Sequence, residues 1–281
     1  MKGAAQNLMA EAARQTTGYR FASTEDREAI VGLVVDAAES VSLRLTPPEL
    51  ASSPAAFRRP DGTSVFRPKH SAVFSSEVLL AAEDRLLERA RTTTAPTVPL
   101  TTVERITKRP DSKGRMLGDD QAAALTKIAL SGRMVDVLVG PAGAGKTTAM
   151  SALRRAWERE HGRGSVVGLA PSAVAAQVLA DDLSIQTENT AKWLYESVGD
   201  GAARRAERVA GLEARLAQLW GAAPTDNRTR QIETIIARLA EQHAAQARFT
   251  LHPGQLLIVD EASMVATAQM AELAARPNRP E

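Results

Sequence analysis

The sequence predicts an α/β domain with a parallel sheet organised around a phosphate-binding loop, with a small α+β module before it. Three observations support this prediction. An apolar run at 135–139 leads into a glycine-rich loop and a helix-compatible segment. Strand-like and helix-like segments alternate from residue 117 onward, which is typical of a parallel sheet covered on both faces. A further apolar run at 256–259 ends in two acids.

The loop that follows residue 139 fits the phosphate-loop pattern G-x-x-x-x-G-K-[ST]. Its glycines allow backbone angles and close approaches that a Cβ would prevent, so successive N–H groups can surround a polyphosphate. The next helix directs its positive end at the same anion, where Lys146 reaches the outer phosphates and the Thr147 hydroxyl ligates Mg²⁺. We expect an ATP and Mg²⁺ site formed by Gly140, Pro141, Ala142, Gly143, Ala144, Gly145, Lys146, Thr147 and Thr148.

Asp260 and Glu261 follow the second apolar run. In a phosphate-loop fold, a strand beside the one that enters the loop delivers a carboxylate to the Mg²⁺ shell. We expect Asp260 to share the metal with Thr147. We expect Glu261 to orient or deprotonate an attacking water, with Lys146 as the other catalytic residue.

Composition excludes several other classes of protein. The chain has 281 residues, 44% of them hydrophobic and none of them cysteine, so a real core is expected and a disulfide framework is excluded. The four histidines are far apart and show no metal-ligand spacing. The formal charge of +2 argues weakly for a polyanionic partner. No apolar run approaches the roughly 20 residues of a membrane span, so we expect a soluble, cytoplasmic protein with no membrane partner.

Residues 1–116 are expected to form the N-terminal accessory α+β module, which ends in the polar stretch 109–118. Its expected elements are a helix capped by Ser23 or Thr24, a short strand at 41–45, a hairpin of 63–66 with 72–74, and a helix capped by Ser75 or Ser76.

Residues 117–281 are expected to form a partial P-loop ATPase domain. Besides the strands at 135–139 and 256–259, the pattern predicts a strand at 166–170, a helix starting at Pro171-Ser172 and a helix capped by Asn189 or Thr190. Leucines and isoleucines at helical spacing predict an inserted helical hairpin at about 200–250. That hairpin either packs on itself and the core or serves as a partner-binding arm.

Five short motifs together resemble a known family: Gln121 ahead of the loop, 140–148, 168–172, 189–194 and 260–264. In this order they are similar to successive motifs of superfamily 1 DNA helicases. More narrowly, they resemble the helicase segment of conjugative relaxase-helicases of the TraA/TrwC type (MobF), which are related to the RecD branch.

The resemblance implies a RecA-like P-loop NTPase fold and further site residues. Gln121 would contact the adenine. The positions that match single-stranded DNA contacts are Pro171, Ser172, Thr190 and Lys192. Trp193 either offers a stacking face or belongs to the core. The residue pattern alone would make Gln121, Ser172 and Thr190 ordinary helix caps or surface residues.

The resemblance also has departures. Family members continue with a Gly-Asp-Pro-x-Gln strand, a second RecA-like domain and arginine fingers, whereas this sequence stops at Glu281. We therefore expect a RecA-like sheet that is incomplete at the C-terminus, with a separate chain that could supply the second lobe. The relaxase's own catalytic domain has no match either, because Tyr19 and Tyr195 lack a nicking-site context.

The expected function is a helicase-like protein that binds Mg-ATP and single-stranded DNA, with weak or absent unwinding alone. Two alternatives stay open. One is a non-catalytic remnant that binds DNA or a partner, and the other is a P-loop ATPase that is not a helicase.

Overall fold

The computed structural model describes residues 3–47, 53–60, 62–66, 73–111, 114–141, 143–221 and 225–275. The chain divides into two compact units, Met1–Arg85 and Leu86–Glu281, and the division falls within helix α3 (Glu77–Arg91). No helix of the described residues has both the length and the apolar character to cross a membrane.

The first unit contains two helices and a small antiparallel sheet. Its elements are β1 (Gly3–Ala4), α1 (Ala5–Gln15), α2 (Thr24–Ser40), β2 (Leu43–Arg44), the 3₁₀ turn η1 (Ala55–Phe57) and β3 (Val73–Ser75). The predicted Ser23 cap is confirmed, because its hydroxyl accepts the Asp26 N–H at 3.0 Å.

The predicted hairpin of 63–66 with 72–74 is wrong. Strand β3 pairs instead with β1 and β2, so the sheet order is β1-β3-β2, while Ser64 bridges to Arg58. Residue 72 lies outside the described residues. Strand partners come from distant parts of the chain, and a local alternation of residues does not specify them.

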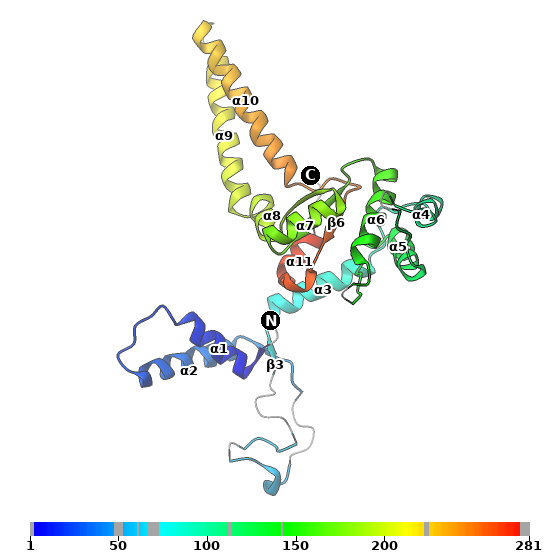
Figure 1. The fold of residues 1–281 in the computed structure, drawn as a ribbon. Coiled ribbons are helices and arrows are strands. Elements are labelled where there is room, and N and C mark those ends of the chain that lie inside the picture. The colour runs from blue at the N-terminus through cyan, green and yellow to red at the C-terminus, as the bar shows by residue number, and fades with distance from the viewer. Residues whose placement is uncertain are drawn as a thin grey trace. The chain divides into compact units, whose positions relative to one another are not determined.

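The second unit contains the parallel sheet and most of the helices (Figure 1). After α3 its elements are α4 (Leu100–Thr107), α5 (Asp119–Ser131), α6 (Lys146–His161), β4 (Val166–Ala170), α7 (Ala173–Leu183), β5 (Gln186–Asn189), α8 (Thr190–Ser197), α9 (Asp200–Trp220), α10 (Asp226–Arg248), β6 (Leu256–Val259), the 3₁₀ turn η2 (Ala262–Met264) and α11 (Thr267–Ala274).

Three parallel strands form the sheet in the order β5-β4-β6. Val166 and Leu169 of β4 point to opposite faces because side chains alternate along a strand. Val166 joins a cluster with Leu153, Trp157, Leu179 and Leu183 of α6 and α7. Leu169 joins a second cluster with Trp193, Phe249 and Leu273. The sheet is therefore covered on both faces, as the alternating pattern predicted.

The predicted strand at 135–139 is wrong. The structure assigns these residues no strand, and Val137 and Val139 are 76% and 86% exposed. The predicted pairing of this run with the 256–259 strand is also wrong, because β6 pairs only with β4 among the described residues. The outer edge of β6 is left without a described partner strand, and 135–139 forms no ladder there.

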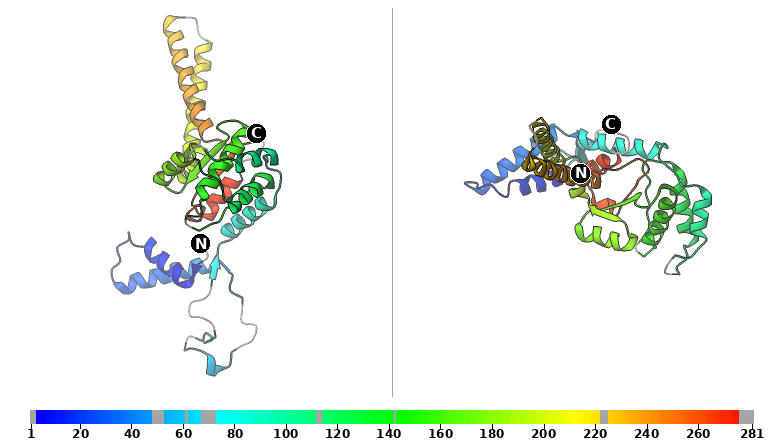
Figure 2. Two further views of the ribbon diagram at one scale, coloured as in Figure 1. Left: turned by 45° about the vertical axis from the view of Figure 1, so that its right-hand side comes forward. Right: turned by 90° about the horizontal axis from the view of Figure 1, so that it is seen from above.

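The predicted helical hairpin is confirmed by α9 and α10, which lie side by side and project from the sheet (Figures 1 and 2). Its base is held by Arg205, which is only 3% exposed. Arg205 forms an ion pair with Glu196 of α8 and donates to Gln246 of α10 at 2.7 Å, so both legs of the hairpin are fixed at one point.

Candidate functional site

The phosphate loop has the backbone that its glycines predicted. Gly143 and Gly145 have φ angles of 77° and 73°, in the left-handed region that favours glycine. Helix α6 begins directly afterward at Lys146. Ala142 lies outside the described residues. The loop is therefore followed directly by the N-terminus of α6, where the helix macrodipole favours binding of an anion.

Lys146 folds back over the beginning of the loop. Its Nζ donates to the Gly140 carbonyl at 2.7 Å and to the Pro141 carbonyl at 3.0 Å. Both partners are neutral, and a phosphate would offer stronger, charge-assisted hydrogen bonds to the same ammonium. Thr147 is exposed and Thr148 is half-buried at the first turn of α6, so the Thr147 hydroxyl is accessible to a metal.

The two acids follow β6 at the carboxyl edge of the sheet. The Asp260 N–H donates to the Leu169 carbonyl at 2.9 Å, which continues the pairing with β4, and the Asp260 carboxylate accepts the Glu261 N–H at 3.0 Å. Glu261 is exposed and has a φ of 48°, one of two positive values among the described non-glycine residues. Such a conformation costs about 1–3 kcal/mol and is common at functional sites.

The order of the elements indicates that the loop and the acids belong to the same end of the sheet. Residues 162–165 form a short connection between α6 and β4, so the helix runs back along the strand that follows it. The N-terminus of α6 is therefore near the end of β4, and β6 ends there too because it is parallel to β4. In open α/β sheets, ligands bind outside the carboxyl ends of the strands.

The structure also brings together the residues that the resemblance matched to single-stranded DNA. Ala170 and Asn189 pair at the ends of β4 and β5, and the Asn189 amide donates to the Pro171 carbonyl at 2.9 Å. Ser172 is exposed and caps α7, where its hydroxyl accepts the Ala175 N–H. The segments 171–172 and 189–192 thus meet at this edge of the sheet.

Thr190 and Lys192 differ in how accessible they are. Thr190 is 2% exposed, and its hydroxyl donates to the Ala170 carbonyl at 3.0 Å. The Lys192 side chain is 54% exposed. Of these two residues, only Lys192 has a side chain that is accessible from solvent.

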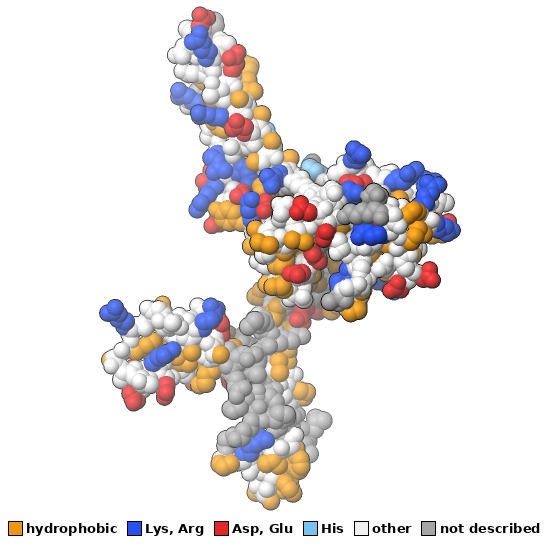
Figure 3. Space-filling view, viewed as in Figure 1, with side chains coloured by type: hydrophobic (Ala, Val, Ile, Leu, Met, Phe, Trp, Pro, Cys, Tyr) orange, Lys and Arg blue, Asp and Glu red, His pale blue; other side chains and the backbone are white. Residues whose placement is uncertain are grey.

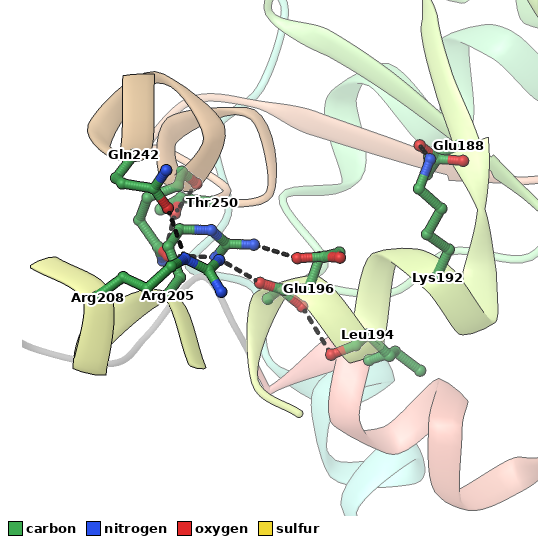
Figure 4. Close-up of polar contacts among 10 residues, drawn as sticks. Glu188, Lys192, Leu194, Glu196, Arg205, Arg208, Gln242 and Thr250 are labelled. Carbon is green, nitrogen blue, oxygen red and sulfur yellow. Dashed lines mark hydrogen bonds and ion pairs between the residues drawn. The ribbon is translucent and has the colours of Figure 1, made fainter. Parts of the chain in front are cut away.

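Lys192 forms a charged group with Glu188 and Arg248 (Figure 4 shows the first two). The Glu188 carboxylate lies 2.8 Å from the Lys192 ammonium and 3.4 Å from the Arg248 guanidinium. Burial raises the pKa of Glu188, but hydrogen bonds from Lys192 and the Asn189 N–H, with the charges of Lys192 and Arg248, outweigh it and hold this pKa below its ordinary value.

Sequence reasoning missed Glu188 and Arg248 in this group. The spacing of Glu188 and Lys192, four residues apart, was an available signal, because such pairs interact on a helix or at its N-terminal end. Arg248 comes from the end of α10 and is sixty residues away from Glu188, a contact that no local pattern encodes.

Gln121, which the resemblance matched to the adenine, contacts the phosphate loop. Its amide nitrogen donates to the Ala144 carbonyl at 2.8 Å, and its amide oxygen accepts the Gly118 N–H at 3.1 Å. Its role toward the adenine stays a prediction. The contact with Ala144 was not foreseen from the sequence.

Comparison with known proteins gives the family. Residues 116–279 match the family model described as an AAA domain. The chain belongs to this family. The P-loop NTPase fold class that the loop predicted is thereby confirmed.

Two curated relatives narrow the resemblance. The chain is 44% identical over 77 residues to the "Conjugal transfer protein TraA" of Rhizobium radiobacter. It is 39% identical over 82 residues to the "Probable conjugal transfer protein TraA" of Sinorhizobium fredii. These matches cover 27% and 29% of this chain, but 7% of each relative. No solved structure matches the chain significantly.

Together, the family and the relatives confirm the resemblance to a TraA-like relaxase-helicase segment with a helicase-type P-loop domain. The chain spans a small part of the relatives' length, so their whole activity does not transfer with this match.

Proposed function

We propose that the chain binds ATP with Mg²⁺ at the carboxyl edge of its parallel sheet. Support comes from the order of the elements: the loop leads into α6, which a short connection joins to β4, and β6, parallel to β4, ends at Asp260. Hard oxygen donors suit Mg²⁺, and an exposed Thr147 hydroxyl with the Asp260 carboxylate supplies them. When bound, the metal would neutralise phosphate charge.

The residues of the chain divide the remaining work. The N–H groups of the loop and the N-terminus of α6 hold phosphate oxygens, while Lys146 exchanges the Gly140 and Pro141 carbonyls for the outer phosphates. Glu261, exposed beside Asp260, accepts the proton of an attacking water or orients it. An arginine finger supplied by a second lobe or a separate chain would speed this hydrolysis further.

We propose single-stranded DNA as the polymer partner. Support comes from the segments 171–172 and 189–192, which meet at the ends of β4 and β5 and carry the exposed Ser172 and Lys192. Such groups contact phosphates without reading sequence. The printed names of the relatives, both conjugal transfer proteins, agree with a DNA partner.

Weak or absent unwinding by this polypeptide alone belongs to the same proposal. Stepping along a strand needs a nucleotide cleft that opens and closes between two lobes. The described residues contain one parallel sheet, which is one such lobe.

Two measurements with the purified chain test the proposal. Fluorescence anisotropy with a labelled oligothymidine should show salt-dependent binding that weakens in Lys192→Ala. Phosphate release should be slow, stimulated by the oligonucleotide and absent in Lys146→Ala. Salt-dependent DNA binding without ATP binding would favour the non-catalytic remnant. ATP hydrolysis that ignores DNA would favour a non-helicase P-loop ATPase.

A further inference from the structure

The Gln121 side chain joins two segments that are far apart in the sequence. Its amide nitrogen donates to the Ala144 carbonyl in the phosphate loop, 23 residues away, and its amide oxygen accepts the Gly118 N–H at the start of α5. These partners fix the amide's orientation, because a carbonyl requires a donor and an N–H requires an acceptor. Gln121 therefore links the start of α5 to the loop.

The amide lies directly against the last glycine of the loop. A Cβ on Gly145 would be 2.3 Å from the Gln121 amide nitrogen, so the approach requires glycine at this position. The φ of Gly145, 73°, requires it as well. The loop and the glutamine thus have complementary shapes.

The contact with Ala144 also determines where a neighbouring N–H points. In a trans peptide, the carbonyl and the N–H of the next residue are directed to opposite sides of the chain, and no described peptide bond is cis. When Gln121 holds the Ala144 carbonyl on one side, the Gly145 N–H is fixed on the other. That N–H precedes α6 and belongs to the loop's set of anion donors.

We propose that Gln121 is a positioning residue: it holds the phosphate loop in the conformation that binds polyphosphate. Its effect on the phosphates passes through Ala144 and Gly145 and is separate from any contact with the base. The inference rests on the proposed Mg-ATP binding. Its consequence is that Gln121 contributes to the affinity for a polyphosphate that carries no base at all.

Calorimetric titration with Mg-ATP and with magnesium tripolyphosphate separates the two roles, because tripolyphosphate lacks the adenine. Gln121→Ala removes both hydrogen bonds. Gln121→Glu keeps the acceptor for Gly118 and lacks the donor for Ala144, but it also adds a negative charge that repels polyphosphate, so the neutral Gln121→Ala carries the test. Gln177→Ala, an exposed glutamine of α7 bonded to Asp181, is the matched control. Thermal melts followed by circular dichroism give the folded fraction of each variant at the assay temperature.

Gln121→Ala should bind tripolyphosphate roughly 2- to 12-fold more weakly than the wild type, the factor that corresponds to losing the one hydrogen bond that holds Ala144. Its Mg-ATP affinity should fall by the same factor, so the ratio of the two dissociation constants stays constant. Gln121→Glu should bind tripolyphosphate at least as weakly, because the added charge repels the ligand. Gln177→Ala should change neither constant.

Unchanged or tighter tripolyphosphate binding in Gln121→Ala, with weaker Mg-ATP binding, would overturn the inference and leave a base contact only. A wild-type chain that binds neither ligand would instead refute the proposed Mg-ATP function, and the inference with it. The wild-type titration therefore distinguishes the two failures.

Discussion

Replacing Arg205 by alanine should lower the free energy of unfolding of the second unit by about 3 kcal/mol, the low end of the cost of breaking a buried ion pair. The Arg205 side chain is 4% exposed, and its guanidinium donates to the Glu196 carbonyl at 2.9 Å and to the Gln246 amide at 2.7 Å (Figure 4). It also lies 5.8 Å from the centre of the Phe249 ring. The low end applies because the partner carboxylate of Glu196 is 27% exposed and keeps some hydration.

Urea unfolding followed by circular dichroism measures this loss, which corresponds to a fall in Tm of about 6–12 °C for a domain of this size. Arg215→Ala, an exposed arginine of the same helix, is the control and should cost less than about 0.5 kcal/mol. Replacing Arg205 and Glu196 together by Met should recover most of the loss, since no buried charge is left unpaired. Equal costs for Arg205→Ala and Arg215→Ala would refute the assignment of Arg205 to the hairpin base.

Four further predictions concern Glu188, Trp193 and Glu261. Glu188→Gln should strengthen oligothymidine binding by about 1.4- to 5-fold, the range that corresponds to one surface ion pair. The reason is that Lys192 and Arg248 lose the carboxylate that competes with DNA phosphates. An unchanged dissociation constant in anisotropy titrations would contradict this prediction. The folded-state pKa of Glu188 lies below its ordinary value of 4.5, so its ionised form contributes stability above that pH. This stability is lost as the pH falls through the folded-state pKa. The free energies of unfolding of the wild type and Glu188→Gln should therefore converge as the pH falls through the folded-state pKa. Trp193→Ala should cost about 3–5 kcal/mol in urea unfolding and leave the DNA affinity of the folded chain unchanged, and a selective loss of DNA binding would mean that the ring stacks on bases. Glu261→Gln should slow phosphate release by at least about 100-fold with Mg-ATP affinity kept, whereas normal turnover would remove Glu261 from catalysis.

The Lys and Arg side chains of the second unit are spread widely over the surface in Figure 3, including the length of the α9–α10 hairpin. On the face shown, they are interspersed with acids along the hairpin. This is why the DNA proposal rests on particular positions such as Lys192 and not on the overall charge.

Local sequence predicted the features that depend on neighbours in the chain. The phosphate loop needs glycines within a few residues of Lys146, and helix caps such as Ser23 and Ser172 bond to N–H groups three residues away. Helical spacing of apolar residues likewise indicated α9 and α10. These features depend on residues that are close together in the sequence, so a short window is enough to predict them.

Features that depend on distant partners were predicted poorly. The run 135–139 has the composition of a buried strand, yet it pairs with none of β4, β5 and β6. Arg205 has the charge of a surface residue, yet Glu196 and Gln246 make its burial possible. In both cases the environment comes from elements that a local window does not include.

The candidate site was predicted in its residues more completely than in its contacts. Asp260 and Glu261 lie where the strand pattern placed them, directly after β6. The contact of Gln121 with Ala144 was not predicted, and the pairing of Glu188 with Lys192 was missed although their spacing allowed it. Such side-chain contacts depend on how the elements pack together. The resemblance to a family gives the positions of the motifs but not these contacts. The domain boundary at 116 stays a prediction.

Calorimetric titration with Mg-ATP tests most directly whether residues 140–148 bind nucleotide. The wild-type chain should bind one Mg-ATP, and Lys146→Ala should weaken binding by about 10- to 150-fold, the value of charged hydrogen bonds to phosphate. Lys127→Ala, an exposed lysine of α5, should bind as the wild type does. Equal affinities of the wild type and Lys146→Ala, or no binding by the wild type, would contradict a Mg-ATP site at this loop.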